Sequence, residues 1–221
     1  MKKIILTLVS VMLLTGVAYA GSFGVGASGS LIKVSADGKE VTGAGALGTA
    51  NTNTKSVEEM SIIGSLFLDY EFDNGVVLGF SHVPGAADVS DKTHSRTETA
   101  QGISGTDASG SVTRTADAEV ENFNTIYIEY PFGAAYAKLG YAQLDVNTKE
   151  NAITDGGTYP NATLDGLTIG AGINGSLGEF FTKTAIEYTD FEDLKINSTT
   201  NNSIEADLDV LEFKVSLGKR F

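Results

Sequence analysis

Two residue types are missing from this sequence and several others are scarce. Its 221 residues include no cysteine, no tryptophan, 3 prolines and 2 histidines. Without cysteine the chain has no disulfides, thiolate metal sites or thiol nucleophiles, and two histidines are too few for a histidine-based metal cage. Basic residues number 15 against 28 acidic ones, a net charge of −13. That balance argues against a nucleic-acid partner.

A long apolar run occurs only at the N-terminus. Lys2 and Lys3 precede an apolar stretch over residues 4–17, and residues 18–20 read Ala-Tyr-Ala before Gly21. This order is typical of a secretory signal peptide, and the stretch falls short of the roughly 20 apolar residues that a spanning helix needs. We therefore expect residues 1–20 to be a signal peptide and residues 21–221 to be one domain. An uncleaved anchor helix is the alternative.

The remaining chain alternates between two kinds of side chain with a period of two, which indicates β-strands with two different faces. In the clearest run Met60, Ile62, Leu66 and Leu68 share one face, while Ser61, Ser65 and Asp69 share the other. Eight such runs occur, near residues 23–27, 60–72, 76–80, 126–132, 135–141, 167–173, 180–188 and 211–221. Eight strands without helices predict an all-β domain.

The connections between these runs alternate in length. Short ones cover residues 73–75, 133–134 and 174–179, and long ones cover residues 36–57, 85–118, 147–162 and 193–205. The long segments are rich in Gly, Ser, Thr, Asn and Asp, which predicts solvated loops. Membrane barrels have short turns at one end and long loops at the other. Aromatic residues of the apolar face gather at the short-turn end, which predicts an interfacial girdle there: Phe23, Tyr70, Phe72, Tyr130, Phe132 and Phe180.

The last run, residues 211–221, has apolar residues at alternate positions and ends in Phe221. This ending resembles the C-terminal signature of bacterial outer-membrane barrels, whose terminal strand is recognised by the barrel-assembly machinery. The mature chain resembles the small OmpA-, OmpX- and opacity-protein-like barrels. It departs from them in lacking tryptophan in the girdle and in having Lys219 at a position that is usually apolar.

The resemblance implies an eight-stranded antiparallel up-and-down transmembrane β-barrel in the outer membrane of a Gram-negative bacterium. A ten-stranded barrel is the alternative, if residues 85–118 contain a further hairpin. The expected partners are outer-membrane lipids, lipopolysaccharide and the barrel-assembly machinery, and we expect a monomer without a cofactor.

On this fold the polar face of the strands lines the interior. It carries charges of both signs, which must pair where they are desolvated: Asp69, Glu71, Glu129, Lys138, Lys183, Glu187, Glu212, Lys214 and Arg220. We interpret them as a polar plug, which favours a structural or surface-interaction role. A narrow porin-like channel for ions or small solutes is the alternative, in which these charges set ion preference.

Two further functions find less support in the sequence. Ser81 and His82 are adjacent on a strand, so their side chains face opposite ways and cannot form a catalytic dyad; His94 lies in the longest loop, and we expect no enzyme. The acidic loops offer carboxylates to divalent cations, yet no ordered ligand spacing is present, and we expect no metal site.

Overall fold

The structure is a computed structural model that describes residues 21–42, 51–88, 94–99, 111–150, 158–198 and 202–221. The predicted signal peptide lies outside these residues. The strands are β1 (Ser22–Thr42), β2 (Asn51–Glu71), β3 (Val77–His82), β4 (Ala86–Asp88), β5 (His94–Thr99), β6 (Ser111–Phe132), β7 (Ala135–Glu150), β8 (Ala162–Leu177), β9 (Phe180–Phe191), β10 (Leu194–Asn197) and β11 (Ser203–Arg220). No helix among the described residues is long and apolar enough to cross a membrane.

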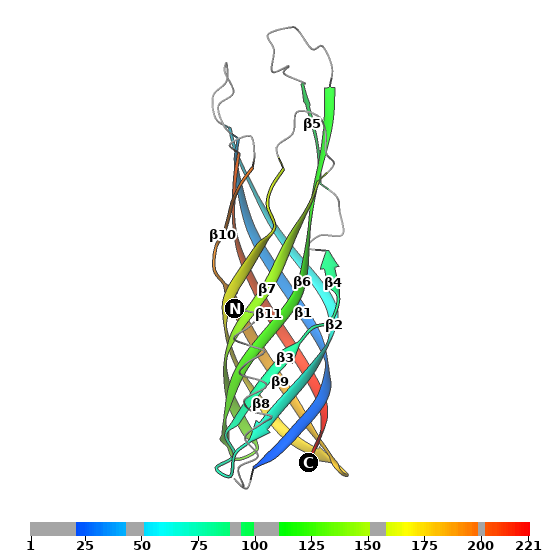
Figure 1. Ribbon diagram of the computed structural model, residues 1–221, viewed down its shortest axis with the longest axis vertical. Helices are drawn as coiled ribbons and strands as arrows, with labels where there is room; N and C mark the ends of the chain where they lie inside the picture. Colours follow the sequence, from blue (N-terminus) through cyan, green and yellow to red (C-terminus); the bar gives the residue numbers. More distant parts are fainter. Residues whose placement is uncertain (1–20, 43–50, 89–93, 100–110, 151–157, 199–201) are drawn as a thin grey trace.

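Eight of these strands form a closed antiparallel barrel (Figure 1). The order is β1-β2-β3-β6-β7-β8-β9-β11, and β11 pairs with β1 to close the ring. Strands β4 and β5 pair only with β6, and β10 pairs with the upper part of β11. The predicted eight-stranded antiparallel barrel is therefore confirmed. Within the described ranges no further hairpin enters the ring, so the ten-stranded alternative is not supported.

The register fixes how steeply the strands tilt. Following paired residues once around the ring leads from Val25 through Leu68, Phe80, Ile126, Tyr141, Leu167, Asp190 and Asp209 to Ser35. The path returns to β1 ten residues above its start, which corresponds to a strand tilt of about 40° in an eight-stranded barrel. Such a barrel is narrow enough for side chains to fill its interior.

The short-turn end holds both ends of the barrel sheet and three tight turns. Phe23 and Phe221 exchange backbone hydrogen bonds of 3.2 and 2.8 Å there. Gly75, Gly133 and Gly178 have φ angles of 79°, 70° and 63° in the turns, values that glycine adopts without steric cost. Figure 1 shows this end at the bottom.

At the opposite end the strands are longer than the sequence predicted. β1 continues to Thr42, β2 begins at Asn51, β6 begins at Ser111 and β7 continues to Glu150, so large parts of the predicted loops 36–57 and 85–118, and the two ends of the predicted loop 147–162, are strand. The polar composition of these segments was misleading, because threonine, asparagine and glycine are tolerated on the solvent-exposed face of a strand when its other face is buried. The barrel therefore extends well beyond its apolar band.

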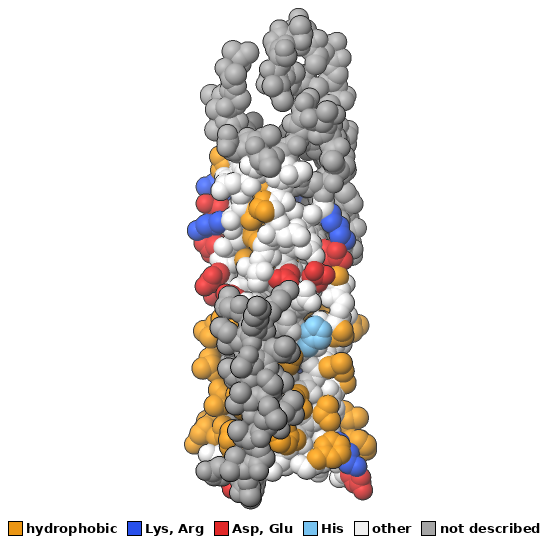
Figure 2. Space-filling view, viewed as in Figure 1, with side chains coloured by type: hydrophobic (Ala, Val, Ile, Leu, Met, Phe, Trp, Pro, Cys, Tyr) orange, Lys and Arg blue, Asp and Glu red, His pale blue; other side chains and the backbone are white. Residues whose placement is uncertain are grey.

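Side-chain polarity inverts part-way up the barrel. On β11 the outward face changes from Leu211 to Asp209, and the inward face changes from Glu212 to Val210. On β9 the outward face changes from Tyr188 to Asp190, while Phe191 becomes the buried inward residue. Figure 2 shows the apolar exterior below this level and a mostly polar exterior above it. From Phe221 to Leu211 the band spans about 25 Å along the barrel axis, the height expected for a membrane barrel.

Above the inversion the interior is a compact apolar cluster. Its buried members are Ile32, Ala142, Leu144, Val146, Leu164, Phe191, Leu208 and Val210. A bulge in β6 brings Ala118 and Val120 against this cluster: the register with β7 shifts between Glu121 and Asn124, and Asn122 has a φ of 55°. One extra residue reverses the alternation, so that Glu119 and Glu121 do not face the apolar interior.

Below the inversion, inward-facing aromatic rings pack over glycines directly across the strands. Register pairs of this kind are Phe67 with Gly26, Tyr127 with Gly79, Tyr136 with Gly172 and Phe181 with Gly218. A β-carbon added at any of these glycines would collide with the ring opposite. The glycines therefore make room for large rings inside a narrow barrel, a pairing that also protects the glycine backbone.

We expect Gly79→Ala to destabilise the barrel by about 1–3 kcal/mol, because the ring of Tyr127 must leave its buried position. The measurement is urea unfolding of the protein refolded in lipid. Gly29→Ala is the matched control, since a β-carbon there meets nothing within 4 Å. In a Tyr127→Ala background the cost of Gly79→Ala should disappear; an unchanged cost would show that the backbone, and not the ring, is responsible.

Candidate functional site

The nine charged residues singled out in the sequence all lie on inward-facing positions of β2, β6, β7, β9 and β11. Seven of them are buried or nearly so, and Glu71 and Arg220 are partly exposed at the short-turn end. Their ion pairs form two groups. We call Lys138, Glu187, Glu212 and Lys214 the upper ion cluster, and Asp69, Glu71, Glu129, Lys183 and Arg220 the lower ion cluster.

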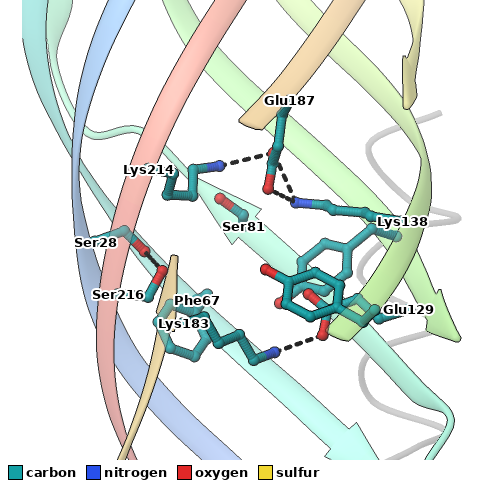
Figure 3. A pocket seen from close by; sticks show the side chains of 11 residues that line it. Ser28, Phe67, Ser81, Glu129, Lys138, Lys183, Glu187, Lys214 and Ser216 are labelled. Carbon is teal, nitrogen blue, oxygen red and sulfur yellow. Dashed lines mark hydrogen bonds and ion pairs between the residues drawn. The ribbon is translucent and has the colours of Figure 1, made fainter. Parts of the chain in front are cut away.

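Glu187 is the centre of the upper ion cluster. Lys138 Nζ donates to both carboxylate oxygens of Glu187 at 2.8 Å. Lys214 Nζ donates to Glu187 Oε2 at 3.0 Å and lies 3.0 Å from Glu212 Oε2. Figure 3 shows the two lysines converging on Glu187 from opposite sides. Each buried charge thus has an opposite charge within contact distance, the condition under which burial of ions is tolerated.

Lys183 is the centre of the lower ion cluster. Its Nζ donates to Glu129 Oε2 at 2.6 Å and to Asp69 Oδ2 at 3.0 Å. Arg220 lies 2.7 Å from Glu71 and 3.7 Å from Asp69, so it joins the group at the short-turn end. The guanidinium of Arg220 also lies 4.5 Å from the ring centroid of Phe181. The lower cluster therefore combines ion pairs with aromatic contacts.

A small cavity of about 20 Å³ lies among the charged side chains, and Ser28, Ser81 and Ser216 also line it. Ser28 Oγ donates to Ser216 Oγ at 2.8 Å (Figure 3). The volume accommodates about one water molecule. Ser30 Oγ and Ser65 Oγ are also buried, and neither has a hydrogen-bond partner among the described residues. The interior of the membrane half is therefore filled almost completely by protein atoms.

Two features of the interior were missed by sequence reasoning. The first is the set of inward aromatic rings: Lys138 Nζ lies 4.1 Å from the ring centroid of Tyr127, and Lys183 Nζ lies within 6 Å of three others. The second is the apolar cluster above the charges. The predicted polar interior thus describes the membrane half, whereas the upper half is apolar. Sequence reasoning identified the inward charged residues of the membrane half but neither their packing nor the inward residues of the upper half, much of which it predicted as loops.

The predicted girdle residues lie at the short-turn end with their rings directed outward. Tyr70 packs edge-on between Phe23 and Phe72, with ring centroids 4.9 Å apart in both pairs. Tyr130 and Phe132 form a second pair at 5.2 Å, and Phe180 is exposed nearby. Lys219, the departure from the C-terminal pattern, donates to Glu179 Oε2 at 2.8 Å in the adjoining turn. An ion pair therefore holds this lysine beside the terminal aromatic residue Phe221.

Aspartates follow the apolar band on three strands. Asp165, Asp190 and Asp209 are the first outward residues above Leu167, Tyr188 and Leu211. Higher up, the hydrogen bond with Asp207 and the nearby Lys195 lower the pKa of Asp193, whereas the hydrogen bond with Asp193 and its negative charge raise the pKa of Asp207. No group of three or more potential ligands in the described part of the chain could hold a metal ion.

Ser81 and His82 point to opposite sides of the barrel wall. Ser81 lines the interior cavity, while His82 Nδ1 lies 2.8 Å from Asn124 Oδ1. The structure therefore separates the two groups that a hydrolase would need together. His94 is the first residue of β5, and the structure describes only its backbone.

No protein-family model matches this sequence, and no curated protein matches it significantly. Similar solved structures include the outer membrane protease OmpT from Escherichia coli, with 9% identity over 94% of this chain and 99% of that chain and a TM-score of 0.46. The outer membrane protein OprG from Pseudomonas aeruginosa has 13% identity over 92% and 97% of the two chains, with a TM-score of 0.43. Ail, the attachment invasion locus protein of Yersinia pestis, has 17% identity over 88% and 99%, with a TM-score of 0.40. The structural neighbours are small outer-membrane β-barrel proteins; the fold assigned above rests on the closed register.

Proposed function

We propose that this protein is an outer-membrane barrel with a closed interior, which acts at the cell surface through the half that extends beyond the membrane. The observation that carries the proposal is that side chains fill the interior of the barrel at two successive levels. Paired ions and aromatic rings occupy the membrane half, and an apolar cluster fills the barrel directly above them. An ion would have to break the ion pairs and then cross the apolar cluster without water.

The exterior supports the location. The apolar band contacts lipid in this proposal, the aspartates above it mark the headgroup level, and the long loops face outward with lipopolysaccharide around them. A signal peptide would direct the chain out of the cytoplasm. The barrel-assembly machinery would then recognise the terminal strand through Phe221. The protein would act as a monomer without a catalytic role. Support for that last point is the separation of Ser81 from His82.

Conductance of the refolded protein in a planar bilayer tests the proposal. We expect no discrete current steps from protein whose folded state is verified by its heat-dependent gel mobility. The narrow-channel alternative predicts steps whose size changes when Lys138 or Glu187 is neutralised. Steps that respond to either substitution would overturn the closed interior, because they would show that ions pass the upper ion cluster. The exposed Lys33→Gln variant is the control for effects of surface charge.

A further inference from the structure

One register row of the barrel carries polar side chains on its outer face. The row crosses β3, β6, β7 and β8, which are consecutive in the ring (Figure 1). We call it the polar row, and its members are His82, Asn124, Gln143 and Asp165. The next outward residues toward the short-turn end are apolar or aromatic: Phe80, Ile126, Tyr141 and Leu167. The polar row is therefore the upper limit of the apolar exterior on these four strands.

The apolar exterior differs in height around the barrel. On β11 it extends from Phe221 to Leu211, about 25 Å along the axis at a rise of about 2.5 Å per residue of a tilted strand. On β6 it extends only from Phe132 to Ile126, about 15 Å by the same count. Membrane barrels have an apolar band about 25 Å tall, so β6 lacks about 10 Å of that height.

The missing height is at the outer end of the strands. At the short-turn end Phe72, Phe132 and Phe180 lie within about 2 Å of one height when positions are counted along the register. A tilt of the whole barrel would lower one side of this girdle and raise the other, so tilt does not explain the difference. Along the polar row each step to the next strand climbs about 3 Å, which places His82 about 9 Å below Asp165.

The other side of the barrel is apolar at the height of His82. Ile186 on β9 and Phe213 on β11 lie within about 3 Å of that height, and they are 60% and 47% exposed. The first outward acidic residues above them, Asp190 and Asp209, lie about 7–11 Å higher than His82. A flat headgroup boundary at the level of these aspartates would leave His82 in hydrocarbon.

Hydrogen bonds hold His82 and Asn124, the low end of the polar row, in place. Asn124 Nδ2 donates to the backbone oxygen of Asn122, so Asn124 Oδ1 accepts a hydrogen bond from His82 Nδ1 at 2.8 Å. Nε2 of the neutral His82 ring is then an acceptor without a partner among the described residues. Acyl chains cannot donate a hydrogen bond to it, and unpaired polar groups are costly in hydrocarbon.

We propose that the polar row is a docking surface for the headgroup layer of the outer leaflet, which follows the row down to its low end and thins the bilayer beside β3 and β6. Bilayers accommodate a short apolar segment by thinning, at a modest cost per ångström. The thin region is local, because the exterior of β2 on the other flank stays apolar up to Met60. This inference rests on the outer-membrane location proposed above and names a lipid contact for it.

The higher part of the exterior beside the row defines the chemistry of the headgroups. Gln143 Nε2 donates to Asp165 Oδ1 at 2.7 Å. Asn122 Nδ2 and Thr163 Oγ1 donate to the two carboxylate oxygens of Asp145 at 2.9 and 2.7 Å. Amide and hydroxyl donors thus hold both carboxylates, and the oxygens keep further lone pairs directed by no lysine or arginine in these bonds. Headgroups rich in hydrogen-bond donors complement such a surface.

The test places a fluorescent label at two lipid-facing positions of equal height. The chain has no cysteine and no tryptophan, so Ile126→Cys on β6 and Ile186→Cys on β9 each give one labelled site. Register counting puts the two positions within about 1 Å of the same height. The labelled proteins are refolded in vesicles of phosphatidylethanolamine and phosphatidylglycerol in which some headgroups carry a nitroxide. We expect the nitroxide to quench the label on β6 at least about twofold more strongly than the label on β9.

Variants of the low end provide the second measurement. His82→Leu combined with Asn124→Leu should reduce quenching of the β6 label to the level of the β9 label, and His82→Leu alone should reduce it partly. Thr184→Val, on the lipid-facing side of β9, is the control and should change neither label. Folding of each variant is verified by heat-dependent gel mobility.

Three outcomes overturn the proposal. The first is equal quenching of the β6 and β9 labels by the headgroup nitroxide. The second is quenching of the β6 label that persists after both leucine substitutions. The third is greater access of dissolved iodide to the β6 label without greater nitroxide quenching, which would show that water alone reaches the low end.

A nitroxide placed on the acyl chains separates this test from a failure of the membrane location. Absence of acyl-chain quenching at both labels would refute the location and the docking surface together. Acyl-chain quenching at both labels, with equal headgroup quenching, would refute the docking surface alone. Conductance of the barrel is independent of either result.

Discussion

Replacing Glu187 by glutamine is expected to lower the free energy of unfolding by about 3–5 kcal/mol, because it leaves Lys138 and Lys214 buried without their shared counter-ion. Both carboxylate oxygens of Glu187 are used, and its side chain is only 4% exposed. Glutamine keeps the shape and one acceptor but removes the charge. The loss is measured by urea unfolding in lipid. Because the chain has no tryptophan for fluorescence, the folded fraction is measured by gel mobility.

A surface pair of almost the same length provides the control. Lys33 Nζ and Glu58 Oε1 are 2.7 Å apart, but their side chains are 40% and 66% exposed. Glu58→Gln should therefore cost less than about 1 kcal/mol. Adding Lys138→Met to Glu187→Gln should recover part of the loss, since it removes the lysine charge left unpaired by the loss of Glu187, whereas Lys214 keeps Glu212 at 3.0 Å. If Glu187→Gln and Glu58→Gln cost the same, water must screen the upper ion cluster, and the interior would be less closed than its packing suggests.

Replacing Leu144 by alanine is expected to cost about 2–5 kcal/mol through the cavity it leaves in the apolar cluster. The effect should also be local. Amides of β7 above Leu144 should lose hydrogen-exchange protection, while those beside Lys138 keep it, because different interactions hold the two halves.

Leu139→Ala is the matched control for that substitution. Leu139 lies on the same strand but is 50% exposed on the apolar exterior. Lipid can fill the space left by its side chain, so no internal cavity forms and the loss should be clearly smaller. Equal losses, or uniform deprotection of the whole of β7, would contradict the division of the barrel into two separately packed halves.

Alternation, taken together with the loop lengths and the aromatic residues at the short-turn end, was enough to assign inward and outward faces in the membrane half. It placed charges such as Asp69, Lys183 and Glu187 on the inner side of the wall, where the structure has them. It could not give their partners, because pairs such as Lys138 with Glu187 join strands separated in sequence and depend on register. The glycine–aromatic pairs were hidden for the same reason: Gly79 and Tyr127 are neighbours only once β3 and β6 are aligned.

The upper half was harder to predict for a different reason. Its inner face is apolar and its outer face polar, the reverse of the membrane half, so no single rule covers a whole strand. The bulge at Asn122 adds a second reversal on β6. A period-two pattern that changes sign twice looks like irregular loop sequence, and this strand was therefore predicted only over residues 126–132 although β6 begins at Ser111.

The coincidence of the inner and outer inversions sets the immersion depth of the protein. A downward shift by one residue pair would carry Asp165, Asp190 and Asp209 into hydrocarbon, and an upward shift would lift Leu167, Tyr188 and Leu211 into water. Both displacements are opposed on β8, β9 and β11, which are neighbours in the ring. On this side of the wall the barrel therefore resists vertical sliding in the bilayer.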